Sequence, residues 1–271
     1  LTAKTAWRGP VGDGGIPLIR TPNGLRAFPT TVFQKGLGHW DLSLDEGYGA
    51  LEHWTAFLVA AEWAVSTMDR NGGWPVWPLL GVTRRSEYSA MSQGVSLLVR
   101  AYRRTSCHKY LVSAKKALEV MLADVDCHGT SRRVCEGVIL EESPKNPPRV
   151  ILNGWVFALF GLYDFLIAEE NATVRSFLDS TLDALVAYLP RFDAGYWSYY
   201  DSEGSIASPF YHALHVAQMQ ALEMAFPDRA EQFRRFRTTL EAESSCILNR
   251  VEAIVKKAWQ RVCCLPKVLV R

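Results

Sequence analysis

From residue 50 onward, the chain repeats one pattern of apolar positions. Four segments begin with an aromatic residue and carry largely small or apolar residues at i+3, i+4 and i+7, and these aromatics are Phe57, Tyr110, Phe177 and Phe233. This spacing predicts helices with one buried stripe. Further apolar segments, at about 89–104, 149–168 and 208–225, predict the intervening helices.

Two helices per repeat indicate stacked hairpins that bury their faces only against their neighbours. The predicted fold is therefore mostly α, an incomplete α/α toroid of about four helical hairpins; an irregular helical bundle is the alternative. Residues 1–49 are rich in Gly, Pro and Thr, with a strand-like run at 30–33, and predict an N-terminal arm with minor β structure. We assign 50–250 to the toroid and 251–271 to a C-terminal helix or tail.

Charge and hydropathy exclude several classes of partner. The chain has 30 basic and 28 acidic residues among 271, so it has no strong field that would attract nucleic acid. No apolar run reaches the roughly 18–20 residues that span a bilayer, and the first residues lack a hydrophobic signal core. We therefore expect a soluble protein, with the cytoplasm favoured and a secreted form whose signal has been removed as the alternative.

The six cysteines form no CxxC pair, and free thiols are expected. Histidines and tyrosines instead cluster beside loop signals, and the cluster contains Tyr199, Tyr200, Tyr211, His212 and His215. Tyrosine hydroxyls are costly to bury without partners, so this clustering indicates a pocket with proton-transfer groups. We expect its chemistry to need no metal and no organic cofactor, because no ligand cluster is evident.

These residue types suit uronic-acid chemistry. The carbon beside a sugar carboxylate is a very weak acid. An enzyme must therefore neutralise that carboxylate, stabilise an enolate-like state and hold a base close to the proton. Inverting the stereocentre also requires a second group that returns a proton to the opposite face. Two tyrosines from different loops can supply both groups.

Six segments, in order from about Pro29 to Leu222, carry a more specific pattern: PTTVFQKGLGHWDL, AAEWAVSTMDRNGGWP, EYSAMSQG with LLVRAY, EESP with ILNG and ALFGLYD, LPRFDAGYWSYYD, and SPFYHALHVAQMQAL. Together they resemble the D-glucuronyl C5-epimerase family, in its C-terminal catalytic domain and its stand-alone bacterial members. The resemblance implies conversion of glucuronate to iduronate within a heparosan-like polymer. It thus implies an anionic uronate-containing polysaccharide as the partner and leaves a homodimer open.

The resemblance also implies site residues. The catalytic groups are expected at Glu142, Tyr200 and Tyr211. Substrate-binding residues are expected at Tyr88, Gln93, Asn153, Tyr199, His212, His215 and Trp40. For the two histidines, helix packing is the alternative. The chain departs from the family pattern at Ser143, where a tyrosine is expected, and at Glu203, where the animal enzymes carry an arginine.

Two other functions stay open at this point. A uronate polysaccharide lyase shares the first proton abstraction and then expels the C4 substituent. A diverged glycan-binding protein without catalysis is the other alternative, motivated by Ser143 and Glu203.

Overall fold

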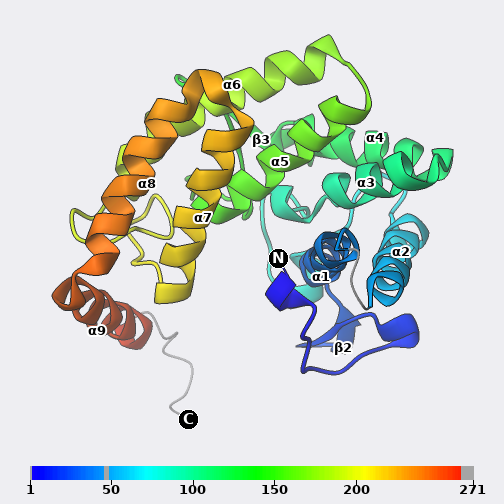
Figure 1. Ribbon diagram of the computed structural model, residues 1–271, viewed down its shortest axis with the longest axis horizontal. Helices are drawn as coiled ribbons and strands as arrows, with labels where there is room; N and C mark the ends of the chain where they lie inside the picture. The colour runs from blue at the N-terminus through cyan, green and yellow to red at the C-terminus, as the bar shows by residue number, and fades with distance from the viewer. Residues whose placement is uncertain (1, 46–48, 264–271) are drawn as a thin grey trace.

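The computed structural model describes residues 2–45 and 49–263, and their α-helices follow one another around an open arc (Figure 1). The helices are α1 Pro29–Ser43, α2 Ala50–Thr67, α3 Val95–Thr105, α4 His108–Leu122, α5 Leu152–Ala168, α6 Ala172–Tyr188, α7 Pro209–Ala225, α8 Ala230–Ser245 and α9 Ile247–Cys263. The strands are β1 Leu18–Thr21, β2 Gly24–Ala27, β3 Ser131–Val134 and β4 Gly137–Leu140.

Consecutive helices pack as hairpins, α1 with α2, α3 with α4, α5 with α6, and α7 with α8. The expected stripes face the core, as in α2, where Phe57, Ala60, Ala61 and Ala64 are buried. The prediction of a mostly helical, incomplete α/α toroid of about four hairpins is confirmed. In Figure 1 the arc runs from α2 on the right, over α5 and α6, to α7, α8 and α9 on the left.

The N-terminal segment differs from its prediction in one respect. Residues 30–33 were expected to form a strand, and they lie instead in the first turn of α1, which begins at Pro29. Proline is well suited to that first helical position because it has no N–H to lose. A Cβ added at Gly36 would lie 2.8 Å from the Cβ of Ala60, so α1 approaches α2 closely through a glycine.

The minor β structure of the N-terminal segment is the antiparallel pair β1–β2, with Leu18 opposite Ala27. Because α1 packs on α2, the first hairpin already begins before residue 50. The division of the chain at residues 49 and 250 stays a prediction.

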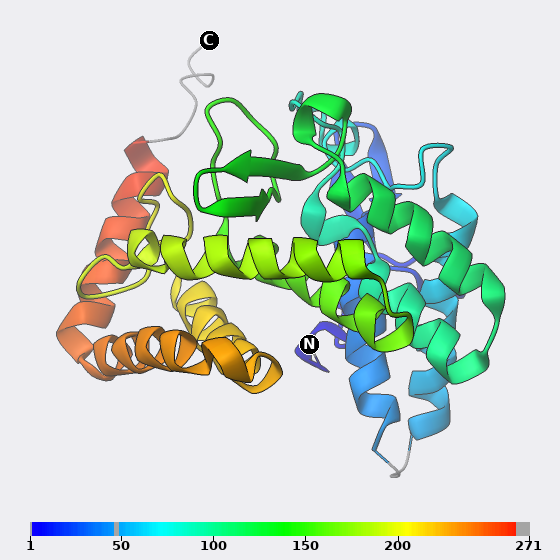
Figure 2. The same ribbon diagram turned by 90° about the horizontal axis from the view of Figure 1, so that it is seen from above.

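Three loops lie between or beside these hairpins and carry most of the predicted site residues. The first follows β4, whose hairpin with β3 packs on α6 (Figure 2). The second, residues 193–207, joins α6 to α7 and is covered by α9, where Ala253 packs with Trp197 and Ile206. The third joins α2 to α3. Among the described residues, no helix is both long and apolar enough to cross a membrane.

Candidate active site

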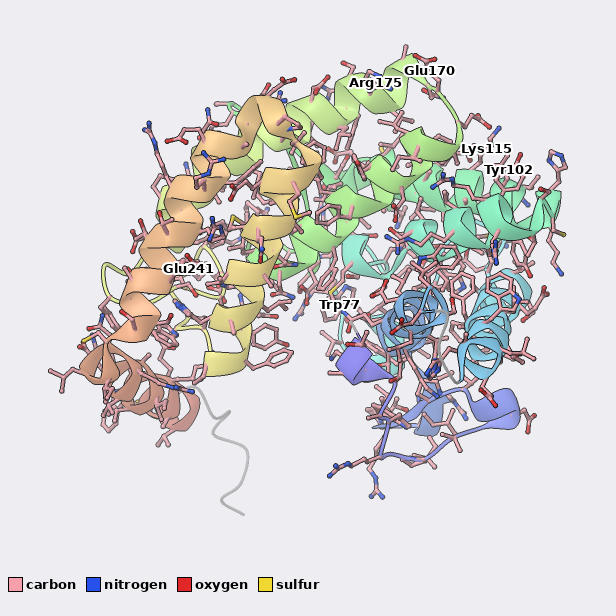
Figure 3. The ribbon with its side chains drawn as sticks, in the orientation of Figure 1. Trp77, Tyr102, Lys115, Glu170, Arg175 and Glu241 are labelled. Atoms are coloured by element: carbon pink, nitrogen blue, oxygen red, sulfur yellow. The ribbon has the colours of Figure 1, made fainter. Side chains whose placement is uncertain are left out.

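A pocket of about 450 Å³ opens where α1, α5 and α7 meet the loops after α2 and β4. Its polar lining includes Glu142, Asn153, Tyr211, Ser89 and Lys4. Its apolar lining includes Trp77, Met91, Phe157 and Phe210. Figure 3 shows Trp77 near the middle of the arc, between the lower ends of α7 and α1. A concave site with aromatic walls and a few polar groups is typical of a binding pocket for an organic ligand.

Glu141 and Glu142 follow β4 directly, and their side chains have different environments. Glu141 is fully buried, pairs with the Arg132 guanidinium and accepts a 3.3 Å hydrogen bond from the Lys145 N–H. The Glu142 Oε2 atom is also buried, but it has no hydrogen-bond partner. Only Glu142 is therefore positioned as an unpaired acid–base group in the pocket wall.

Burial raises the pKa of Glu142 to about 7, and the nearby positive charge of Arg149 offsets only part of this shift. Removing a carboxylate from water disfavours its ionised form, which explains the direction. A Cβ at Gly154, near the start of α5, would lie 2.1 Å from Oε2. The glycine thus allows the Glu142 carboxyl group to lie directly against that helix.

Tyr200 and Tyr211 come together from the second loop and from the start of α7. Their ring centroids are 4.7 Å apart in an edge-on arrangement. Ser208 caps α7 by accepting a 3.4 Å hydrogen bond from the Tyr211 N–H, so Tyr211 lies in the first turn of that helix. Only Tyr211 of the pair lines the pocket, and Tyr200 packs beside it.

Both phenols have a raised pKa. Burial is the main cause for each, and the charge of Glu142 adds to it. A hydrogen bond with Tyr200 partly offsets the shift at Tyr211. The three predicted catalytic side chains therefore lie within electrostatic reach of one another. At neutral pH the tyrosines are protonated and suited to donate protons, whereas Glu142 is near its midpoint.

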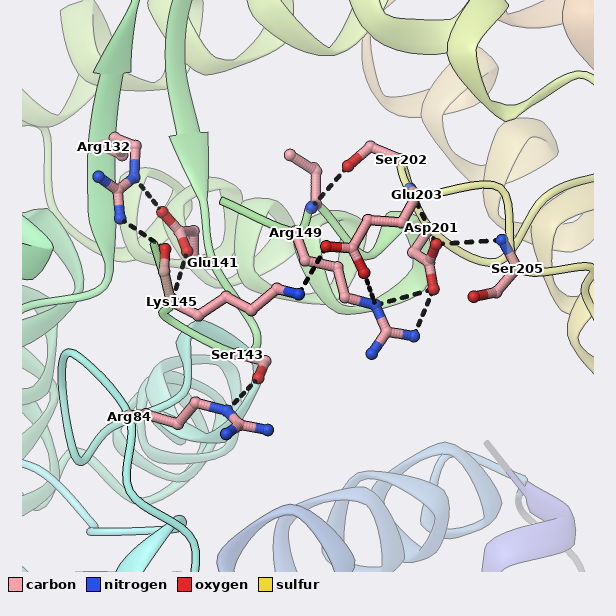
Figure 4. A network of polar contacts seen from close by, with 11 residues as sticks. Arg84, Arg132, Glu141, Ser143, Lys145, Arg149, Asp201, Ser202, Glu203 and Ser205 are labelled. Atoms are coloured by element: carbon pink, nitrogen blue, oxygen red, sulfur yellow. Dashed lines mark hydrogen bonds and ion pairs between the residues drawn. The ribbon is translucent and has the colours of Figure 1, made fainter. Parts of the chain in front are cut away.

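A network of ion pairs joins the first two loops (Figure 4). Arg149 pairs with the fully buried Asp201 and also lies 3.6 Å from Glu203. Lys145 pairs with Glu203 at 2.5 Å. Asp201 Oδ1 accepts hydrogen bonds from the backbone N–H groups of Glu203 and Ser205. Glu203, where an arginine was expected, thus links the loop that carries Glu142 to the loop that carries Tyr200.

Ser143, where a tyrosine was expected, accepts a hydrogen bond from the side chain of Arg84. Its Oγ accepts a 2.9 Å hydrogen bond from Arg84 Nε, as Figure 4 shows. The Arg84 guanidinium lies 4.9 Å from the centre of the Trp77 ring, which lines the pocket. The serine therefore positions a cation at the rim of the pocket.

The predicted substrate-binding residues divide into two groups. Asn153 lines the pocket, and its buried Oδ1 has no hydrogen-bond partner. Tyr88 and Gln93 are buried instead. The Tyr88 hydroxyl donates a 2.6 Å hydrogen bond to Asp69, and Gln93 Nε2 donates to the Ser89 carbonyl. These bonds hold both side chains behind the pocket wall, so their expected contact with substrate stays a prediction.

Tyr199, half-buried, packs with Trp197 rather than lining the pocket. His212 and His215 are also outside the pocket lining: they are 2% and 0% exposed, and both approach Ser198 Oγ within 3.0 Å through Nδ1. His212 also stacks on Trp197 at 3.7 Å. The substrate-binding role of the two histidines stays a prediction, with helix packing as the alternative that their burial favours.

Trp40 also lies outside the lining of this pocket, and its substrate-binding role stays a prediction. It lies far along α1 from the pocket-lining residues Thr30 and Gln34 and packs on Trp54 and Phe57 of α2. Within residues 2–45 and 49–263, no three metal-binding side chains gather into a site, and the five cysteines of this part are free thiols. Cys264 lies outside the described residues.

Trp77 and Arg149 are among the site residues that the sequence did not identify. Trp77 follows the GGW turn at 72–74 after a Pro-Val pair, and Arg149 follows Pro147-Pro148. Both lie in aperiodic loops, where an aromatic or cationic residue next to proline was the available signal.

Comparison with known proteins identifies the family. Residues 70–239 match the family described as D-glucuronyl C5-epimerase C-terminus. A D-glucuronyl C5-epimerase of Caenorhabditis elegans is 31% identical over 192 residues, which cover 61% of this chain and 31% of that protein. An uncharacterized protein of Methanocaldococcus jannaschii is 32% identical over 127 residues, which cover 45% of this chain and 41% of that protein.

Among solved structures, an unsaturated glucuronyl hydrolase from Streptococcus agalactiae is similar with a TM-score of 0.52. It is 15% identical, and the match covers 79% of this chain and 58% of that one. This likeness supports the toroid fold alone. The chain spans less than half the length of the two curated relatives, and it belongs to the D-glucuronyl C5-epimerase C-terminus family.

Proposed function

We propose that this member of the D-glucuronyl C5-epimerase C-terminus family epimerises glucuronate to iduronate residues within a heparosan-like polysaccharide. The observation that carries the proposal is the unpaired, buried carboxyl oxygen of Glu142, which lines one pocket with the protonated Tyr211, against which Tyr200 packs. An acid or base with a pKa near the working pH is suited to proton transfer.

In the proposed reaction, the Glu142 carboxylate takes the proton from C5 of the sugar. The electron pair of that C–H bond moves toward the substrate carboxylate, which becomes an enolate. Tyr211, which lines the pocket, then donates its phenol proton to C5 from the opposite face. Tyr200 is hydrogen-bonded to Tyr211 and stabilises the phenolate that forms. Solvent returns the proton to Tyr211 and removes the one on Glu142.

The two tyrosines suit donation better than abstraction. Their pKa is raised by burial and by the charge of Glu142, so a phenolate base is scarce at neutral pH. Glu142 is the stronger candidate for the base, because its pKa of about 7 leaves part of it ionised. Ser143 has no proton-transfer part in this reaction and acts through its contact with Arg84.

The test is incubation of the protein with heparosan in deuterated water, followed by NMR of the uronate C5 position. The expected result is deuterium at C5 together with iduronate signals, both lost in Glu142→Gln. An unsaturated product that absorbs in the ultraviolet would replace the proposal with a lyase. Binding of heparosan without any deuterium uptake would replace it with a glycan-binding protein.

A further inference from the structure

Arg84 has an unusual environment for a cation at the rim of a pocket. It is half-buried, and three contacts fix it: its stacking on Trp77, its Nε bond to Ser143, and a 3.1 Å bond from Nη1 to the Thr83 carbonyl. An arginine held in this way loses little side-chain entropy when it binds a ligand.

The charge of Arg84 is not neutralised by the protein. Among the described residues, Arg84 has no carboxylate partner, and its Nη2 atom has no hydrogen-bond partner. Figure 4 shows both terminal nitrogens directed away from Ser143. Its neighbour Arg85, in contrast, is paired with Asp126 at 2.7 Å, and Arg149 is paired with Asp201. Arg84 thus keeps donors available in the geometry that matches a carboxylate.

The position of Arg84 relative to the acid–base group decides which carboxylate it would meet. The positive charge that lowers the pKa of Glu142 is that of Arg149. Arg84 is connected to the pocket by the Trp77 ring and by Ser143, whose side chain is turned away to meet it. The guanidinium is therefore placed for a group at the side of the pocket that Trp77 lines, and Arg149 is the cation that acts on Glu142.

We propose that Arg84, positioned by Ser143 and Trp77, forms an outer subsite that binds the carboxylate of a neighbouring uronate in the same polymer. The inference rests on the proposed polymeric uronate substrate. It assigns a role to Ser143 as a positioning residue, because its short hydroxyl leaves room for the guanidinium and orients it. The consequence is a preference for polymer over a single glucuronate residue.

Direct binding tests the subsite without requiring catalysis. Calorimetric titration with heparosan should give an affinity about 10-fold weaker for Arg84→Gln than for the unaltered protein, as expected for loss of one charge-assisted hydrogen bond. Arg85→Gln is the matched control and should bind normally. Carboxyl-reduced heparosan, a neutral probe, and methyl glucuronide, a single residue, should each bind Arg84→Gln and the unaltered protein equally.

A double-mutant cycle tests the part assigned to Ser143. Ser143→Ala should weaken heparosan binding less than Arg84→Gln, and the double variant should be no weaker than Arg84→Gln alone, because the serine acts through the arginine. Ser143→Thr, which keeps the hydroxyl, should restore binding. Additive losses in the double variant would overturn the positioning role.

Several results would overturn the subsite itself. These are normal heparosan binding by Arg84→Gln, an equal loss for the carboxyl-reduced polymer, or a loss for methyl glucuronide that matches the loss for polymer. In the exchange assay, Arg84→Gln should raise KM about 10-fold and leave kcat nearly unchanged, since the subsite does not touch the reacting atoms. Arg84-dependent binding without any exchange would refute the epimerase proposal and support the subsite. Exchange with an unchanged KM in Arg84→Gln would instead support the epimerase proposal and refute the subsite.

Discussion

Replacing Glu142 with glutamine should stabilise the protein at pH 8 while abolishing its activity. The pKa of Glu142 is raised from 4.5 to about 7 by burial, so the folded protein holds this proton more tightly than the unfolded chain does. A group of this kind contributes stability that is fully present below pH 4.5 and is lost as the pH rises through about 7. Glutamine is close in size and never ionises, so the variant avoids that loss.

The magnitude follows from the size of the shift. Each unit of pKa difference corresponds to about 1.4 kcal/mol, and the shift from 4.5 to about 7 acts mostly between pH 5 and pH 8. The stability of Glu142→Gln relative to the unaltered protein should therefore rise by about 2–3 kcal/mol over this interval. Other titrating groups affect both proteins equally and cancel in the difference.

Urea unfolding at pH 5, 6, 7 and 8 measures this difference. Glu231→Gln is the matched control, because Glu231 is exposed and its pKa is lowered by Arg235. Its stability difference should stay nearly constant over the same pH range. A constant difference for Glu142→Gln as well would show that the carboxyl group is not held in a desolvated state, and the assignment of Glu142 as the base would lose its physical support.

Three further predictions concern the reaction. The rate of deuterium exchange into heparosan should rise with pH through about 7, as Glu142 loses its proton, and a rate that falls through this range would contradict its role as the base. Tyr211→Phe should lower the exchange rate by about 10²–10⁴-fold, and Tyr200→Phe should lower it less, since Tyr200 acts through Tyr211; equal rates for both variants and the unaltered enzyme would exclude the tyrosines as acids. Asp201→Asn removes the charge that pairs with Arg149, so Arg149 should lower the pKa of Glu142 further and move the rising limb of the pH–rate profile to lower pH. An unmoved limb in a folded variant would mean that this ion pair does not influence Glu142.

The helical part of the fold could be read from the sequence because its signal is local. In α2, the aromatic at 57 and the small residues at 60, 61 and 64 repeat with the helical period and are all buried. The run at 30–33 misled because Thr, Thr, Val and Phe each favour strands. The helical conformation of this segment is favoured by Pro29 at the first helical position and by the close approach of Gly36 to Ala60. The second is a tertiary contact, which the four residues 30–33 alone do not reveal.

The sequence predicts the positions of residues that lie within a recognisable motif better than it predicts their contacts with other loops. Glu142, Tyr200 and Tyr211 lie close enough to affect one another's pKa, and their catalytic roles stay predictions. For His212 and His215 the substrate-binding role stays a prediction, because a spacing of three places them on one helix face without saying whether that face meets the pocket or the core. The core position follows from Ser198, which lies in another loop and bonds to both rings.

Two adjacent carboxyl groups, Glu141 and Glu142, show how the loops set different chemistry at neighbouring positions. Both are removed from water, which raises the pKa of each, but only Glu141 receives a guanidinium partner, Arg132. The cation that lowers the pKa of Glu142 is Arg149, and its charge is shared with Asp201 and Glu203. If Arg149 were free to pair with Glu142, the carboxylate would be stabilised and would become a weak base. In the proposed reaction, the two acids that hold Arg149 would therefore keep Glu142 basic enough to abstract a proton, and Glu203 would contribute to this although it stands where a cation was expected.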